Sequence, residues 1–127
     1  PDARTTNRDG NDIMDEIAPG PQDIVIRKLK PSAFHGTPLT SFLVNLGADS
    51  LIVTGTTTSG CVRASVLDAF SNNFRTVIVE EGCFDRSQAS HAINLCDMQA
   101  KYADVVQMDD ALEYIESIDA EYNLPTG

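Results

Sequence analysis

Cys61 is the residue of this chain best suited to act as a nucleophile. It follows the turn Gly55-Thr-Thr-Thr-Ser-Gly60, which joins a β-branched run to a stretch of apolar residues at helical spacing. In the first turn of a helix, unpaired N–H groups and the positive end of the helix dipole stabilise a thiolate. The alternative is a structural cysteine, because free cysteines are among the most buried residues.

Lys28 is the second candidate for chemistry, because it ends an apolar strand in a chain that has three lysines. An ammonium group beside a cysteine would stabilise the thiolate and could take part in proton transfer. The alternative is a surface lysine whose stem lies along apolar side chains. Arg27 would point to the other face of the strand, so we do not expect it to share the role.

The threonine-rich turn and a later arginine could bind a substrate. Backbone N–H groups of Thr57 and Cys61 lie where an oxyanion would form, and such donors stabilise a transition state by roughly 3–4 kcal/mol. Alternatively, these threonines are ordinary turn residues. The planar guanidinium of Arg86 suits a substrate carboxylate, or it could form a surface ion pair with Asp85 or Glu81.

No motif for a metal or a cofactor is present, so we expect neither. His35 and His91 are the only histidines, and their spacing is not that of a metal site. The three cysteines, Cys61, Cys83 and Cys96, have unrelated spacings. We therefore expect no disulfide framework, and a reducing cytoplasm is the expected location.

Length and charge narrow the possible partners. A chain of 127 residues predicts one domain with a modest core. Nineteen acidic against nine basic residues give a net charge of −10, which argues against nucleic acid or an anionic membrane as a partner. The apolar runs are too short to span a bilayer. A small molecule is the substrate class that these observations leave.

Strands and helices are predicted to alternate along the chain. We expect strands at 23–28, 50–54, 74–80 and 103–107, and helices at 38–46, 61–72, 87–102 and 109–118. Residues 1–22 are predicted as a leading loop, with one short helical turn around 12–17, and residues 119–127 as a tail. Short loops between alternating elements are typical of a three-layer α-β-α fold with a parallel sheet. Ligands bind at the carboxyl ends of such strands, where Lys28, Cys61 and residues 83–86 would meet.

Two motifs occur together at a defined spacing. They are Asp23-Ile-Val-Ile-Arg-Lys28 with Ser32-Ala-Phe34, and Val53-Thr-Gly-Thr-Thr-Thr-Ser-Gly-Cys61-Val-Arg63, with 61 − 28 = 33 residues between lysine and cysteine. The pair resembles the isochorismatase-like cysteine hydrolase superfamily over about residues 19–115. Together with Lys101-Tyr-Ala-Asp-Val105, it looks most like the branch of N-carbamoylsarcosine amidohydrolase, maleamate amidohydrolase and biuret hydrolase.

The resemblance implies a cysteine-lysine-aspartate triad. Cys61 would attack an amide carbonyl, Lys28 would assist proton transfer, and an aspartate would act as general base. It also implies a cis peptide bond between Thr56 and Thr57, with the Thr57 and Cys61 N–H groups as the oxyanion hole. The implied reaction is hydrolysis of a linear C–N bond, with release of ammonia through a thioester.

The resemblance further implies how the substrate is bound and how the protein assembles. Arg86 matches the position that receives a substrate carboxylate, and we place Thr58 and Phe34 in the same substrate pocket. Relatives form dimers or tetramers, so a homo-oligomer is expected.

The catalytic aspartate of the family has no counterpart in this chain. That aspartate ends a strand well upstream of the lysine, whereas the aspartates upstream of Lys28 end no apolar strand: Asp2, Asp9, Asp12, Asp15 and Asp23. We therefore expect residues 1–127 to be the C-terminal portion of a single isochorismatase-like domain. Its N-terminal strands would come from elsewhere, for example from a second chain. The alternative function is a non-catalytic scaffold or subunit of the same fold.

Overall fold

A three-stranded parallel sheet with strand order β1-β2-β3 lies at the centre of the computed structural model, which describes residues 12–118. The predicted three-layer fold with a parallel sheet is confirmed, whereas residues 1–11 of the predicted leading loop and the predicted tail lie outside the described residues. A single 3₁₀ turn at Asp15–Ile17 lies within the predicted short turn. The elements are α1 (Leu39–Asn45), β1 (Ser50–Thr56), α2 (Arg63–Ser71), β2 (Arg75–Phe84), α3 (Gln88–Lys101), β3 (Asp104–Val106) and α4 (Met108–Ser117).

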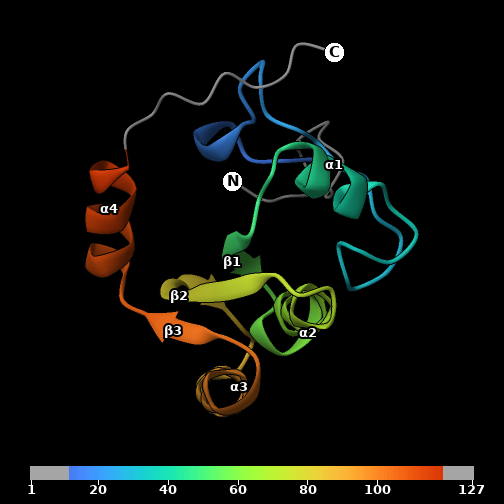
Figure 1. Ribbon diagram of the computed structural model, residues 1–127. Coiled ribbons are helices and arrows are strands. Elements are labelled where there is room, and N and C mark those ends of the chain that lie inside the picture. Colours follow the sequence, from blue (N-terminus) through green and yellow to red (C-terminus); the bar gives the residue numbers. More distant parts are fainter. Residues whose placement is uncertain (1–11, 119–127) are drawn as a thin grey trace.

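Helices cover the middle strand on both faces. Figure 1 shows α2 and α3 together on one side of the sheet and α4 apart from them on another side. Ile78 and Val79 are adjacent in β2 and point to opposite faces, yet both are buried. The main core joins α2, β2 and α3 through Val62, Val66, Ile78, Cys83, Leu95 and Met98. Within residues 12–118, no helix has the length and apolarity that crossing a membrane requires.

The prediction of a strand at 23–28 is wrong for the described structure. A strand needs a hydrogen-bonded neighbour, and among residues 12–118 the first sheet strand, β1, pairs with β2 alone. Ile24 and Ile26 instead line a hollow of about 300 Å³ against α1. The sheet therefore has three described strands instead of four, and Ile52 of β1 is 40% exposed.

Strand β2 is longer than predicted and takes in part of the predicted loop after residue 80. Val53 is opposite Ile78 but Gly55 is opposite Cys83, so β2 advances five residues while β1 advances two. Gly82 permits this irregularity, because a Cβ atom there would lie 2.8 Å from Thr54 Cγ2. The bulge brings the end of β2 beside the end of β1, next to the turn that carries Cys61.

The helix ends follow local sequence signals closely. Helix α1 ends at Asn45, two residues before Gly47, whose φ of 66° suits glycine, and Ala48 N–H donates to the Leu43 carbonyl at 3.0 Å. The helix begins one residue later than predicted, although the Thr37 hydroxyl still accepts a hydrogen bond from Leu39 N–H at 3.4 Å. Ser87 caps α3 by accepting a hydrogen bond from Ser90 N–H.

Candidate active site

The Lys28 ammonium lies 3.3 Å from Cys61 Sγ. Lys28 Nζ also donates to the carbonyl oxygens of Lys30 and Pro31, at 3.0 and 3.1 Å. An ammonium group has three hydrogens, so each of them has an acceptor. The two residues on which the sequence argument depends are therefore in contact, with the ammonium fixed by its own loop.

Cys61 lies in a π-helical turn, Thr58–Val62, between β1 and α2. The Thr57 carbonyl accepts hydrogen bonds from Gly60 N–H at 2.9 Å and from Val62 N–H at 3.2 Å, which closes the turn. Cys61 is half-buried. The predicted strand-to-helix junction is confirmed, although regular α-helix begins only at Arg63. The peptide bond between Thr56 and Thr57 is cis, as the resemblance implies.

Lys28 and Cys61 open onto a cavity of about 390 Å³. Phe34, predicted to lie in the substrate pocket, lines it and packs against Phe74 with ring centroids 6.2 Å apart. No described aspartate or glutamate lines this cavity. Most of the wall is apolar and comes from the loop before α1, from α1, β1 and α2: Ala33, Phe34, Leu39, Leu43, Leu51, Ile52, Val53, Val62 and Ala69. The arrangement can hold a small organic molecule against a sulfur nucleophile.

Thr58 and Arg86, the other predicted substrate contacts, do not line this cavity. Thr58 is completely buried, and its hydroxyl lies 2.8 Å from His91 Nδ1. Arg86 is exposed on the loop after β2. Among the described residues its side chain forms no hydrogen bond or ion pair. The predicted roles of both residues in substrate binding stay predictions.

Asp85, which directly follows β2, has a role that the sequence did not indicate. Its Oδ2 accepts a hydrogen bond from Ser59 N–H at 2.8 Å, and its Oδ1 accepts one from Arg86 N–H at 2.8 Å. Hydrogen bonds from Ser59, with a smaller contribution from Arg86, lower the pKa of the Asp85 carboxyl group. The group is therefore an ionised acceptor at neutral pH. Glu81, the other predicted partner of Arg86, accepts Met108 N–H at 2.9 Å instead.

Comparison with known proteins identifies the family. The model of the isochorismatase domain matches residues 3–110. The chain belongs to the isochorismatase family. It is 38% identical over 106 residues to maleamate amidohydrolase of Pseudomonas putida, covering 84% of this chain and 50% of that protein. It is 42% identical to N-carbamoylsarcosine amidase of an Arthrobacter species, covering 84% of this chain and 40% of the relative.

A solved structure of similar sequence has the same fold. The structure of N-carbamoylsarcosine amidase from Thermoplasma acidophilum superimposes with a TM-score of 0.73 at 31% identity, covering 81% of this chain and 58% of the other. The chain thus spans about half the length of the curated relatives that it matches.

The aspartates considered from the sequence do not complete an isochorismatase-type triad in the described structure. Asp12, Asp15 and Asp23 do not line the cavity of Cys61, and the Asp23 carboxylate accepts Gly20 N–H at 2.7 Å. Asp2 and Asp9 lie outside the described residues. Among residues 12–118, no group of three or more His, Cys, Asp or Glu side chains could hold a metal ion.

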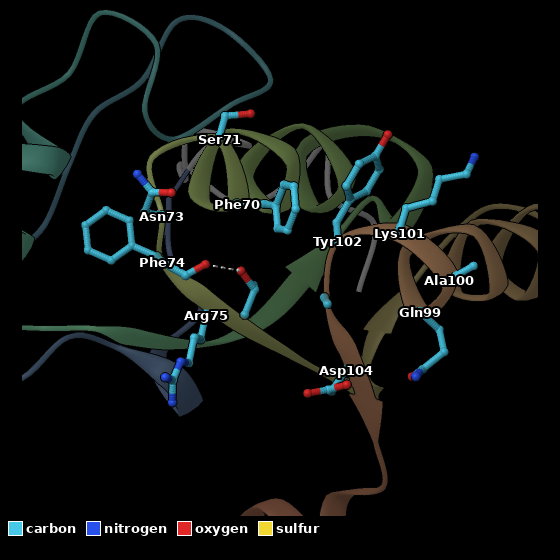
Figure 2. Close-up of a pocket in the computed structure, with 12 residues that line it drawn as sticks. Phe70, Ser71, Asn73, Phe74, Arg75, Gln99, Ala100, Lys101, Tyr102 and Asp104 are labelled. Atoms are coloured by element: carbon cyan, nitrogen blue, oxygen red, sulfur yellow. Dashed lines mark hydrogen bonds between the residues drawn. The ribbon is translucent and has the colours of Figure 1, made fainter.

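A larger hollow of about 720 Å³ lies where β2 and β3 begin (Figure 2). Phe70 and Tyr102 stand beside each other there, with ring centroids 5.6 Å apart, and no cysteine lines the hollow. Ligands of parallel α/β sheets bind at the opposite, carboxyl ends of the strands. The smaller cavity at Cys61 is therefore the candidate active site of this isochorismatase family member.

Proposed function

We propose that this chain carries the nucleophile of an amidohydrolase that cleaves a linear C–N bond of a small substrate and releases ammonia. The observation that carries the proposal is the 3.3 Å contact between Lys28 Nζ and Cys61 Sγ at the mouth of a cavity. Relatives named maleamate amidohydrolase and N-carbamoylsarcosine amidase support the same bond type.

The proposed reaction has two stages. The Cys61 thiolate attacks the amide carbonyl carbon and forms a C–S bond, and the oxyanion is held by the Thr57 and Cys61 N–H groups. The C–N bond then breaks as the leaving nitrogen takes a proton from the Lys28 ammonium, which lies 3.3 Å from Cys61 Sγ. Water gives one proton to the general base and attacks the thioester, the C–S bond breaks and the thiolate is restored, and the other proton of water stays with the carboxylic acid product. The general base then passes its proton to the neutral Lys28 amine. The Lys28 charge stabilises the thiolate at the beginning and at the end.

The general base of this mechanism must come from outside the described cavity, because no described carboxylate lines it. We propose that it is an aspartate on a segment that pairs with the free edge of β1. Among residues 12–118, β1 pairs only with β2, so its other edge is free, and the matched residues cover only 50% of maleamate amidohydrolase. The segment would be the N-terminal part of the same enzyme, in the same or in a second chain.

The substrate that we propose is a small amide that bears a carboxylate, such as a carbamoyl amine or the monoamide of a short dicarboxylic acid. A cavity of about 390 Å³ suits a molecule of this size. Arg86 would bind the carboxylate, and Phe34 would border the pocket, with Thr58 behind it in the turn that carries Cys61. We also propose a cytoplasmic homo-oligomer, a dimer or a tetramer, that uses no cofactor.

Ammonia release from a panel of small amides tests the proposal. The chain is assayed alone and together with the proposed N-terminal segment, and Cys61→Ala is compared with Cys96→Ala, which removes an exposed thiol. We expect activity in the completed enzyme, its loss in Cys61→Ala and its retention in Cys96→Ala. Activity that survives Cys61→Ala would exclude the thiolate mechanism.

The absence of a carboxylate from the described cavity also favours a second candidate, the non-catalytic scaffold. A completed protein that assembles but releases no ammonia from any amide, with Cys61 no more reactive than Cys96, would support the scaffold.

A further inference from the structure

Two side chains that have no role in the proposed reaction, those of His91 and Asp85, attach the turn that carries Cys61 to the rest of the structure. The Thr58 hydroxyl meets His91 Nδ1 of α3 at 2.8 Å. One residue further, Ser59 N–H donates to Asp85 Oδ2, just after β2, also at 2.8 Å. Both attached residues lie within one turn before Cys61, so they fix the backbone from which its sulfur projects.

The other end of the turn is attached to the same helix. Arg63, the first residue of α2, donates through Nη1 to Asn94 Oδ1 at 2.7 Å and to Asp97 Oδ2 at 3.1 Å. Helix α3 and the loop before it therefore hold the turn both before and after Cys61. Contacts of this kind restrict the turn to one orientation relative to the sheet.

We propose that His91 and Asp85 are positioning residues that hold Cys61 Sγ against Lys28 Nζ. The inference deepens the proposed function and rests on it, because it assumes that Cys61 is the nucleophile. A nucleophile displaced by about 1 Å can lose on the order of 100-fold in rate.

Burial makes the contact of Thr58 with His91 the more important of the two. Thr58 is 0% exposed, so solvent does not reach its hydroxyl while His91 is in place, and His91 is the partner that satisfies it. Lys28, by contrast, is exposed and is fixed by carbonyl oxygens of its own loop. Contacts with α3 thus fix the position of Cys61 Sγ, whereas the carbonyl oxygens of residues 30 and 31 fix that of Lys28 Nζ.

The lowered pKa of Asp85 agrees with a positioning role. Both of its carboxylate oxygens accept backbone N–H groups, and these hydrogen bonds favour the ionised form. A carboxylate with a lowered pKa is a poor general base at neutral pH. Asp85 is therefore suited to orient the turn and unsuited to replace the aspartate of the triad.

The test is the rate at which iodoacetamide alkylates Cys61, followed by mass spectrometry of the Cys61 peptide in the full chain at neutral pH. The exposed Cys96 of the same molecule is the internal reference. Thr58→Val keeps the shape of the side chain and removes its hydroxyl, whereas Thr58→Ser keeps the hydroxyl. Thr76→Val is the matched control, since Thr76 is also buried and its hydroxyl donates to the Phe74 carbonyl away from the site.

We expect Thr58→Val and His91→Ala to lower the ratio of Cys61 to Cys96 alkylation by about fivefold or more, and Thr58→Ser to stay within about twofold of wild type. Thr76→Val and His35→Ala, which changes the other histidine, should leave the ratio unchanged even where they lower the melting temperature. Should Thr58→Val fail to fold, Asp85→Ala makes the same test at a half-buried position.

A wild-type ratio in folded Thr58→Val and His91→Ala would overturn the positioning role while the proposed function stands. An equal loss in Thr76→Val would also overturn it, because the effect would then be general destabilisation. A wild-type Cys61 that reacts no faster than Cys96 would instead contradict the nucleophile itself, and the positioning role with it.

Discussion

Replacing Lys28 by methionine should slow the reaction of Cys61 with iodoacetamide by about fivefold at neutral pH. The charges in question are 3.3 Å apart. Because Lys28 is exposed, a water-like dielectric constant of about 80 applies, and Coulomb's law gives about 1 kcal/mol of attraction between the ammonium and a negatively charged sulfur. A free energy of about 1 kcal/mol corresponds to about a fivefold change in rate. Methionine keeps most of the apolar stem and removes only the ammonium.

The assay compares Lys28→Met with Lys30→Met, its neighbour two residues along the chain. The Lys30 carbonyl accepts a hydrogen bond from Lys28, and a side-chain substitution leaves that carbonyl in place. We expect Lys30→Met to react at the wild-type rate. Added salt should slow wild type more than Lys28→Met, because it screens an exposed charge pair.

The result that refutes the reasoning is equal alkylation of Cys61 in wild type and Lys28→Met at low salt. An equal effect of Lys30→Met would also refute it, because the rate would then depend on the net charge of the loop and not on the contact.

The remaining predictions concern stability. Gly82→Ala should lower the free energy of unfolding in urea by about 1–3 kcal/mol, because its Cβ would lie 2.8 Å from Thr54 Cγ2. Adding Thr54→Ser, which removes that methyl group, should recover part of this loss. Gly20→Ala is the control and should change the free energy little, because its Cβ would lie 3.6 Å from the nearest atom. Hydrogen bonds lower the pKa of Asp85 from 3.8 in the folded state. The stability that ionised Asp85 contributes is therefore present above pH 3.8 and is lost as the pH falls through the folded-state pKa. The stabilities of wild type and Asp85→Asn should converge over that range in acid unfolding. Burial raises the pKa of Cys83 from 9.0 in the folded state. The stability that the neutral Cys83 thiol contributes is therefore present below pH 9.0 and is lost as the pH rises through the folded-state pKa. Wild type should lose stability relative to Cys83→Ala over that range. Parallel curves for either pair would contradict the corresponding assignment.

The local signals in the sequence were sufficient for most of the fold. Helices α1 to α4 and the three paired strands lie within a few residues of their predicted positions, because helical periodicity, β-branched runs and capping residues act over neighbouring residues. The segment 23–28 shows where this reasoning fails. Its composition suits a strand, but a strand forms only where another strand offers hydrogen-bonding partners.

The residues of the candidate active site also separate into those that the sequence predicts and those that it does not. The motif spacing indicates the family and selects both Lys28 and Cys61, so both residues follow from the sequence alone, although residues 23–28 form no strand in the described structure. The contact of Thr58 with His91 does not, because an isolated histidine in a helix has no sequence pattern that reveals its partner.

The sequence by itself determined the alternation of elements, the candidate nucleophile and its cationic neighbour, since these depend on residue types and local spacing. Only the tertiary structure decided the length and bulge of β2, the open edge of β1 and the attachment of the Cys61 turn to α3. Each of these depends on atoms from distant parts of the chain meeting in space: a missing side chain at Gly82 lets two strands approach, and a buried hydroxyl must find its partner on whichever helix packs against it.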